Sequence, residues 1–197
     1  MKNRPYHHGD LPAALLARAE QTLHERGSGA LTLRELARDI GVSSAAPLRH
    51  FKTKQALLDA LALAGFERLA ETIAASQEGV GESFAERLDA AARAYVGFAL
   101  ANAALLDLMF SVKHGPEASQ ALRATAQRWS GQIVALIDDG QRRGEVRQGV
   151  PERVALPVFA ALHGYASLAV SGILPPELAE HGLGDVIASI LRGCEPE

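Results

Sequence analysis

Cysteine is almost absent from this chain of 197 residues, and this scarcity excludes the small proteins that are held together by disulfides. The single cysteine, Cys194, has no second cysteine in the chain with which to pair. A reducing compartment suits such a composition. Lys2 and Arg4 are followed by polar residues rather than by the apolar run of a signal peptide. We therefore expect a cytoplasmic protein.

The chain also lacks the spacings that are typical of metal centres and catalytic sites. It contains no HExxH and no paired CxxC, and the adjacent His7 and His8 stand in a polar stretch where solvated histidines are common. No nucleophile stands beside an evident general base. We expect no metal, no cofactor and no enzymatic activity; an all-α enzyme is an alternative that turnover of a substrate by the purified protein would favour.

Charged residues are missing from residues 154–176, a run of 23 residues that is long enough to cross a bilayer. Pro157, His163 and the Pro175-Pro176 pair interrupt its apolar character. We therefore expect a helix buried between protein surfaces, with no membrane partner.

No sustained alternation of apolar and polar residues indicates β-strands, whereas apolar residues recur at helical spacing through most of the chain. The sequence predicts an all-α fold. A long fourth helix follows the possible cap Thr53, and a further helix follows Ser83 and runs toward Leu105. Expected helices cover residues 10–25, 32–40, 44–51, 54–78, 84–105, 116–140, 151–168 and 185–192.

The net charge of −3 hides an asymmetry along the chain. Residues 1–60 hold nine Lys and Arg against six Asp and Glu, which is a net charge of +3. The remaining residues hold eleven against seventeen, a net charge of −6. A positive surface suited to nucleic-acid phosphates is therefore expected in the amino-terminal part.

Residues 31–51 predict a helix-turn-helix. Thr32 and Glu35 form a capping-box pattern, and the apolar residues at positions 33, 36, 37 and 40 share one helix face. Gly41 can adopt the left-handed conformation that ends a helix. Capped helices joined by a glycine turn also occur in helical bundles that never contact DNA, so such a bundle is the alternative interpretation of this segment.

A second helix is expected to begin at Ser43 or Ser44. Pro47 is tolerated there as the third helical residue, because its missing N–H would have no partner within the helix. Leu48 and Phe51 are expected to face the core, while Arg49 and His50 project outward.

In this region the chain resembles the tetracycline-repressor (TetR) family of bacterial regulators. The family motif is matched by Thr32, Leu36, Ala37, Gly41, Val42, Ser43, Leu48, Phe51 and Lys54. Two positions depart from it, since the family often has an aliphatic residue at 47 and an aromatic residue at 48. The segments YHHGDLPAALLARA and AAPLRHF are also similar to a branch of the family with a His-Gly pair in its carboxy-terminal domain, matched here by His163 and Gly164.

The resemblance implies a helix-turn-helix DNA-binding domain at residues 1–55 and a helical ligand-binding and dimerisation domain at 56–197. The second helix of the motif would read base edges in the major groove, and other residues would hold phosphates. Because one short helix covers few base pairs, a homodimer on a near-palindromic operator is expected, paired through the last two helices. The expected DNA-binding residues are Thr32, Arg34, Ser43, Ser44, Ala45, Ala46, Arg49, His50 and Lys54.

The resemblance further implies a carboxy-terminal pocket for a small-molecule effector that releases a repressor from DNA. Aromatic residues at helical spacing also form ordinary cores, so packing is the alternative interpretation of the same residues. A dimeric ligand-binding or adaptor protein that no longer binds DNA is the alternative function. The expected lining residues are Phe98, Asn102, Met109, Phe110, Trp129, Phe159, His163 and Tyr165.

Overall fold

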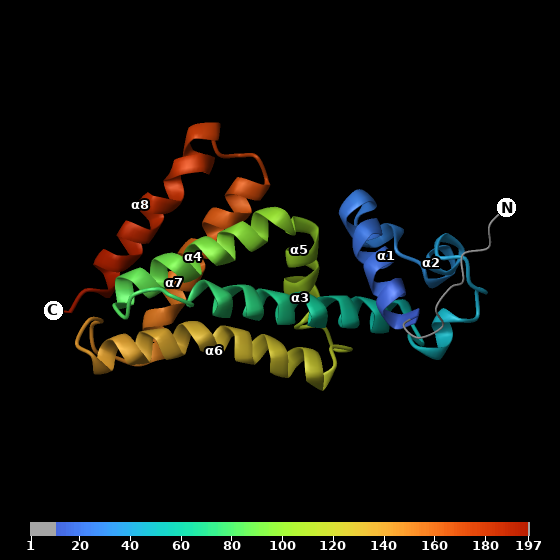
Figure 1. Ribbon diagram of the computed structural model, residues 1–197, viewed down its shortest axis with the longest axis horizontal. Helices are drawn as coiled ribbons and strands as arrows, with labels where there is room; N and C mark the ends of the chain where they lie inside the picture. The colour runs from blue at the N-terminus through green and yellow to red at the C-terminus, as the bar shows by residue number, and fades with distance from the viewer. Residues whose placement is uncertain (1–10, 197) are drawn as a thin grey trace. The chain divides into compact units, whose positions relative to one another are not determined.

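The computed structural model describes residues 11–196, and within them it contains only helices and connecting segments. The predicted all-α fold is confirmed (Figure 1). The elements are α1 (Leu11–Arg26), η1 (Ser28–Ala30), α2 (Leu33–Asp39), η2 (Pro47–Arg49), α3 (Lys54–Ser76), α4 (Phe84–Ala101), α5 (Ala103–Val112), α6 (Gln120–Arg142), α7 (Pro151–Val170) and α8 (Pro176–Cys194), where η marks a 3-10 helix.

The chain divides into two compact units. Of the described residues, the first unit holds 11–65 and 104–123, and the second holds 66–103 and 124–196. The division falls within α3, ten residues beyond the boundary expected after residue 55. Helix α5 from Ala104 onward belongs to the first unit, although the sequence predicts these residues in the carboxy-terminal domain.

In the first unit, α1 packs against α2 and η2 around fully buried apolar side chains such as Leu15, Ala19 and Leu36. The first half of α3 lies close to α5, because a Cβ added at Gly65 would stand 2.6 Å from the Met109 sulfur. The N–H of Ser119 donates to Asp59 Oδ1 at 2.7 Å, which ties the segment after α5 to α3.

In the second unit, α4, α7 and α8 pack against one another. Helix α7 contributes buried Val154, Val158 and Ala166 to this core. Among the described residues α7 is the one single helix long and apolar enough to cross a membrane, a test that core helices also pass. Its packing against α4 and α8 agrees with the expectation of a helix between protein surfaces.

The expected helix over 84–105 is wrong in length, because Asn102 ends α4. Its backbone leaves helical geometry at φ −132° and ψ 39°, and both its backbone N–H and its side-chain amide donate to the Phe98 carbonyl. Helix α5 then begins at Ala103. The Phe98 carbonyl thus keeps its helical partner and gains a second donor, a local bond from side chain to backbone that the spacing of apolar residues does not indicate.

The expected start of the last helix near residue 185 is also wrong, since α8 begins at Pro176. The Pro175-Pro176 pair was interpreted as a stop. Proline is instead well suited to the first helical position, because its missing N–H is one of those that have no partner in a helix. The segment between α7 and α8 is therefore short.

Candidate functional site

The start of α2 is fixed by Thr32. Its hydroxyl accepts a hydrogen bond from the Glu35 N–H at 3.2 Å and donates to the Glu35 carboxylate at 3.0 Å. The predicted cap is confirmed. The reciprocal bond differs from the expected one, because Glu35 contacts the Thr32 hydroxyl rather than its N–H. The Thr32 hydroxyl would have to leave Glu35 before it could donate to a phosphate.

A glycine ends α2 and turns the chain, as predicted. Gly41 has a φ of +76°, and its N–H donates to the Arg38 carbonyl. The N–H of Val42 donates to the Ala37 carbonyl at 2.9 Å. These two bonds form a Schellman motif, which sets the direction in which the following residues leave α2.

The segment after this turn is not the α-helix that the sequence predicts. Ser44 and Ala45 form a turn, Ala46 lies in a bend, and Pro47–Arg49 is a single 3-10 helix. Pro47 has no N–H to donate to the Ser43 carbonyl, which accepts from Ala46 three residues on instead. A helix starting at Ser43 is therefore interrupted within its first turn.

Leu48 was expected in the core, but it is 51% exposed, and Pro47 is buried in its place. The Phe51 N–H donates to the Pro47 carbonyl four residues back, at 2.8 Å. Residues four apart along a helical turn share a face, so Pro47 accompanies buried Phe51 and Leu48 points away. An apolar side chain consequently stands beside the expected reading residues.

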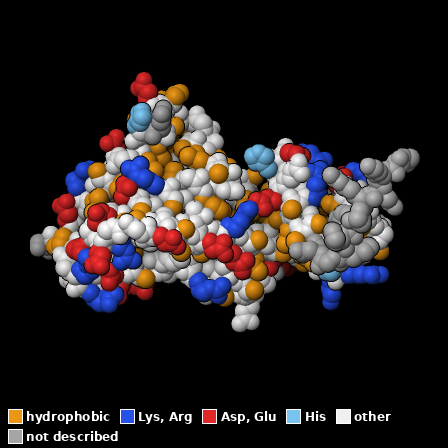
Figure 2. All heavy atoms as spheres, in the orientation of Figure 1, with side chains coloured by type: hydrophobic (Ala, Val, Ile, Leu, Met, Phe, Trp, Pro, Cys, Tyr) orange, Lys and Arg blue, Asp and Glu red, His pale blue; other side chains and the backbone are white. Residues whose placement is uncertain are grey.

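Most of the expected DNA-binding side chains lie on the surface of the first unit. Ala46 is half-buried, and Lys54 is exposed with its Nζ 3.4 Å from the Gly29 carbonyl. Figure 2 shows Lys and Arg side chains on this unit. Lys52 is a further exposed cation, and its position just before the Thr53 cap of α3 could have indicated it from the sequence. The exposed members of the expected set are Thr32, Arg34, Ser43, Ser44, Ala45, Arg49, His50 and Lys54.

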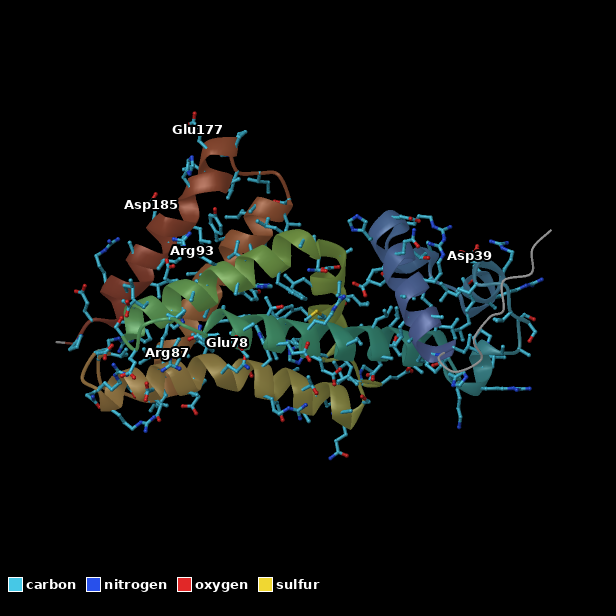
Figure 3. The ribbon with its side chains drawn as sticks, in the orientation of Figure 1. Asp39, Glu78, Arg87, Arg93, Glu177 and Asp185 are labelled. Carbon is cyan, nitrogen blue, oxygen red and sulfur yellow. The ribbon has the colours of Figure 1, made fainter. Side chains whose placement is uncertain are left out.

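An ion pair holds α2 against α1. Arg18 donates from Nε to Asp39 Oδ2 at 3.0 Å, and its Nη2 lies 2.8 Å from the same oxygen. Asp39 is labelled at the end of α2 in Figure 3. The hydrogen bond from Arg18, with the positive charges nearby, lowers the pKa of the Asp39 carboxyl. Arg18 is thereby engaged within the protein rather than available to a phosphate.

The second unit encloses a cavity of about 450 Å³ between α3, α4, α6 and α7. Three buried or half-buried rings form part of its wall. The centroids of Trp129 and Phe159 are 5.4 Å apart in an edge-on arrangement, and Tyr95 stacks on Trp129 at 6.1 Å. The Tyr95 hydroxyl lies 2.7 Å from His163 Nδ1, and burial raises the pKa of Tyr95.

Polar side chains line a more exposed part of the same cavity. Arg87, labelled in Figure 3, donates from α4 to Asp139 Oδ2 at 3.0 Å. Arg142 donates to the other oxygen of Asp139 at 3.1 Å. Gln132 also lines the wall, and its Oε1 is buried. This size and this mixture of rings with a few polar groups are typical of small-molecule sites.

The expected ligand residues do not all meet at this cavity. Trp129 and Phe159 line it, and His163 contacts both Tyr95 and Phe159. Phe98 is buried in α4, and Asn102 caps that helix. The sequence analysis missed Tyr95, which follows the same α4 stripe as Phe98, and Gln132, three residues after Trp129. The others lie elsewhere: Met109 and Phe110 in α5 of the first unit, and Tyr165 in a groove of about 510 Å³ between α7 and α8.

Several large apolar side chains of α7 and of the segment after it are exposed. Leu156 on α7 is 66% exposed and Leu168 is 42% exposed, while Ile173 after α7 is 71% exposed. Cys194 lines the groove, and burial raises the pKa of its thiol. Exposed apolar residues that gather into a patch are characteristic of protein interfaces, and of these three Leu168 lines the groove.

No group of three or more potential metal ligands gathers among residues 11–196.

A model of the family "Bacterial regulatory proteins, tetR family" matches residues 15–61, and a model of the tetracycline-repressor-like carboxy-terminal domain matches residues 88–191. The second of these covers more than half of the chain.

Individual proteins are similar over shorter or longer stretches. A structure of a protein from Rhodococcus sp. RHA1, described as having unknown function, is 40% identical with a TM-score of 0.91, covering 98% of this chain and 100% of that one. A TetR family transcriptional regulator from Thermus thermophilus is 23% identical with a TM-score of 0.69, covering 92% and 98%. An HTH-type transcriptional regulator of Mycobacterium bovis is 28% identical over 142 residues, or 70% of this chain. The match spans 60% of that relative's own length.

Proposed function

This chain belongs to the TetR family of bacterial regulatory proteins, and from that membership we propose that it is a dimeric DNA-binding transcription regulator, a repressor released by a small-molecule effector. The single observation that carries the proposal is the segment 43–50, which follows the Gly41 turn at the end of α2 and exposes Ser43, Ser44, Ala45, Arg49 and His50. In this proposal residues 1–55 bind DNA, and 56–197 bind the effector and the second copy. Catalysis is no part of it, and the protein acts in the cytoplasm.

The proposed roles of the surface residues follow from their chemistry. Arg49 can donate two hydrogen bonds to a guanine edge, whereas Arg34, His50 and Lys54 would hold phosphates. Two copies would present these surfaces to half-sites about 34 to 36 Å apart on a near-palindromic operator. An effector that binds one dimer geometry a hundredfold better than another would shift DNA affinity by about 2.7 kcal/mol.

Fluorescence anisotropy with DNA from upstream of the chain's own coding region tests the proposal. Binding should weaken steeply between about 50 and 200 mM salt, because displaced counterions drive the association of a protein that contacts several phosphates. Arg49→Ala should remove the preference for the upstream fragment over shuffled DNA. Lys54→Ala should weaken binding to both and reduce the salt slope by about 1. Arg93→Ala, in an exposed pair with Asp89 on α4, is the matched control and should bind as the unmodified protein does.

A second candidate function has a specific observation in its favour. The segment 43–50 carries one 3-10 turn and an exposed Leu48 where a reading helix was expected. A helical dimer that binds a ligand or a protein partner without contacting DNA is consistent with that surface. Anisotropy that fails to rise with any fragment at about 50 mM salt, together with a folded dimer, would favour this alternative and contradict the first.

A further inference from the structure

The side chains that line the cavity of the second unit indicate which kind of ligand would bind there. Tyr95 and Trp129 are 4% and 6% exposed, and Phe159 meets both rings with centroid distances of 6.3 and 5.4 Å. The three aromatic rings therefore line the same cavity. Such a wall favours a flat apolar molecule that can stack on one ring and meet another edge-on.

One polar atom on the wall lacks a partner. Within residues 11–196, Gln132 Oε1 is the one buried side-chain nitrogen or oxygen that has no hydrogen bond. An amide oxygen can only accept, and a buried acceptor without a donor is unfavourable. Gln132 lines the same cavity as the three rings, and a donor group on a bound molecule would satisfy Oε1 once the side chain turns that buried oxygen toward the space. The Tyr95 hydroxyl already lies 2.7 Å from His163 Nδ1.

Both arginines at the cavity are paired with carboxylates, and because Arg142 also contacts Asp138 at 3.3 Å, two positive charges face two negative ones. Asp139 lies between Arg87 and Arg142, each of which is within 3.1 Å of one of its oxygens. Arg87 also donates to Gln77 Oε1 at 3.4 Å. A ligand carboxylate would have to compete with Asp139 for either arginine, and a ligand cation would have to displace an arginine from Asp139. An uncharged ligand avoids both costs.

From these three features we infer that the cavity binds an uncharged aromatic molecule with a hydrogen-bond donor, of the class of aryl alcohols, whose hydroxyl donates to Gln132 Oε1. The inference rests on the proposed function only in naming this molecule as the effector. Binding itself can be measured without DNA.

Isothermal titration calorimetry of the full chain with four matched probes tests the ligand class. The probes are 2-naphthol, 2-methoxynaphthalene, 2-naphthoate and the cation 2-naphthylmethylammonium. We expect 2-naphthol to bind about tenfold more tightly than the methoxy compound, which keeps the rings and loses the donor, and more tightly than either ion. Equal affinity for naphthol and its methyl ether, or tighter binding of either ion, would overturn the inference.

Substitutions in the cavity wall test whether the ligand hydroxyl contacts Gln132. Gln132→Leu should remove the preference for naphthol over its methyl ether while both still bind. Gln127→Leu, the same change at an exposed position of α6, should keep that preference. Ala91→Phe fills the cavity from α4 and should abolish binding of all four probes. Ala135→Phe does the same from an exposed position on α6, should the first variant fail to fold. Unchanged naphthol binding in a folded filling variant would overturn the inference.

A final measurement separates this inference from the proposed function. If the chain binds 2-naphthol with the expected preference but binds no DNA, the cavity assignment stands and the DNA-binding proposal fails. If the chain binds DNA but does not bind 2-naphthol, the DNA-binding proposal stands and the cavity assignment fails. Release of bound DNA by 2-naphthol, and not by 2-methoxynaphthalene at the same concentration, supports both.

Discussion

The hydroxyl of Tyr95 on α4 lies 2.7 Å from Nδ1 of His163 on α7, and this contact ties two packed helices of the second unit beside its cavity. His163 also stacks on Phe159 with ring centroids 5.4 Å apart. The pair therefore holds one ring of the cavity wall against another. The His163-Gly164 pair that suggests a branch of the family includes this histidine, and that branch assignment stays a prediction.

Removal of the Tyr95 hydroxyl should lower the stability of the protein without creating a cavity in its core. Tyr95→Phe keeps the ring and loses one largely buried hydrogen bond, so we expect the free energy of unfolding in urea to fall by about 1 kcal/mol. A double-mutant cycle with His163→Ala isolates the contact, because the second change should cost less when the hydroxyl is already gone. Losses that simply add would show that the two side chains do not stabilise each other.

The Arg18–Asp39 pair predicts a dependence of stability on pH. The hydrogen bond from Arg18 lowers the pKa of Asp39 in the folded protein below its ordinary value near 4. A depressed carboxyl pKa stabilises the fold above that ordinary value, and the contribution is lost as the pH falls through the folded pKa. Asp39→Asn should therefore unfold at lower urea than the unmodified chain at pH 7, and the difference should narrow below about pH 4.

Asp107→Asn provides the control for this pH dependence, because Asp107 is exposed on α5 in the same unit. We expect its urea midpoint to follow that of the unmodified chain from pH 7 to pH 3. A difference for Asp39→Asn that stays constant over this range would contradict the assignment to Asp39 ionisation.

Local rules predicted the ends of several helices from the sequence because those ends depend on neighbouring residues. Thr32 caps α2, Thr53 caps α3 and Ser83 caps α4, each through a hydrogen bond to an N–H three residues on. Gly41 ends α2 for a similarly local reason. The segment 43–50 was predicted less well, because the absence of one N–H at Pro47 outweighed a favourable serine cap and two alanines.

The cavity could be predicted only in part, since apolar spacing identifies the buried face of a helix but not which buried faces leave a space between them. Trp129 and Phe159 were expected at the site and line it, whereas Met109 is equally apolar and packs against Gly65 in the other unit. Gln132 was missed because a single polar residue in an amphipathic helix is ordinary. Its significance depends on the burial of its oxygen, which is a property of the folded chain.

Any side chain at position 41 should destabilise the turn that ends α2. With φ at +76°, Gly41→Ala places a Cβ in the left-handed region, and we expect a loss of about 1 to 2 kcal/mol in the free energy of unfolding. Gly97→Ala is the matched control, because Gly97 is an exposed position inside α4 with nothing within 4 Å of an added Cβ. That variant should gain about 0.5 to 1 kcal/mol, since alanine is the better helix former. Equal effects of the two changes on the urea midpoint would contradict a special role for the Gly41 conformation.

If two copies of the chain pair as proposed, the exposed apolar residues of α7 predict where they meet. Leu168 is 42% exposed and lines the groove between α7 and α8, so a self-complementary interface at these helices would bury it. Leu168→Glu would then place an unpaired carboxylate in an apolar contact, and we expect light scattering after size exclusion to shift from a dimer toward a monomer. Leu100→Glu makes the same change at a 48% exposed position of α4 and should leave the dimer intact. Because two half-sites are read together only by a pair, Leu168→Glu should also weaken binding to the upstream DNA while a cooperative unfolding transition is retained. A dimer that survives Leu168→Glu and dissociates with Leu100→Glu would place the interface on α4 instead.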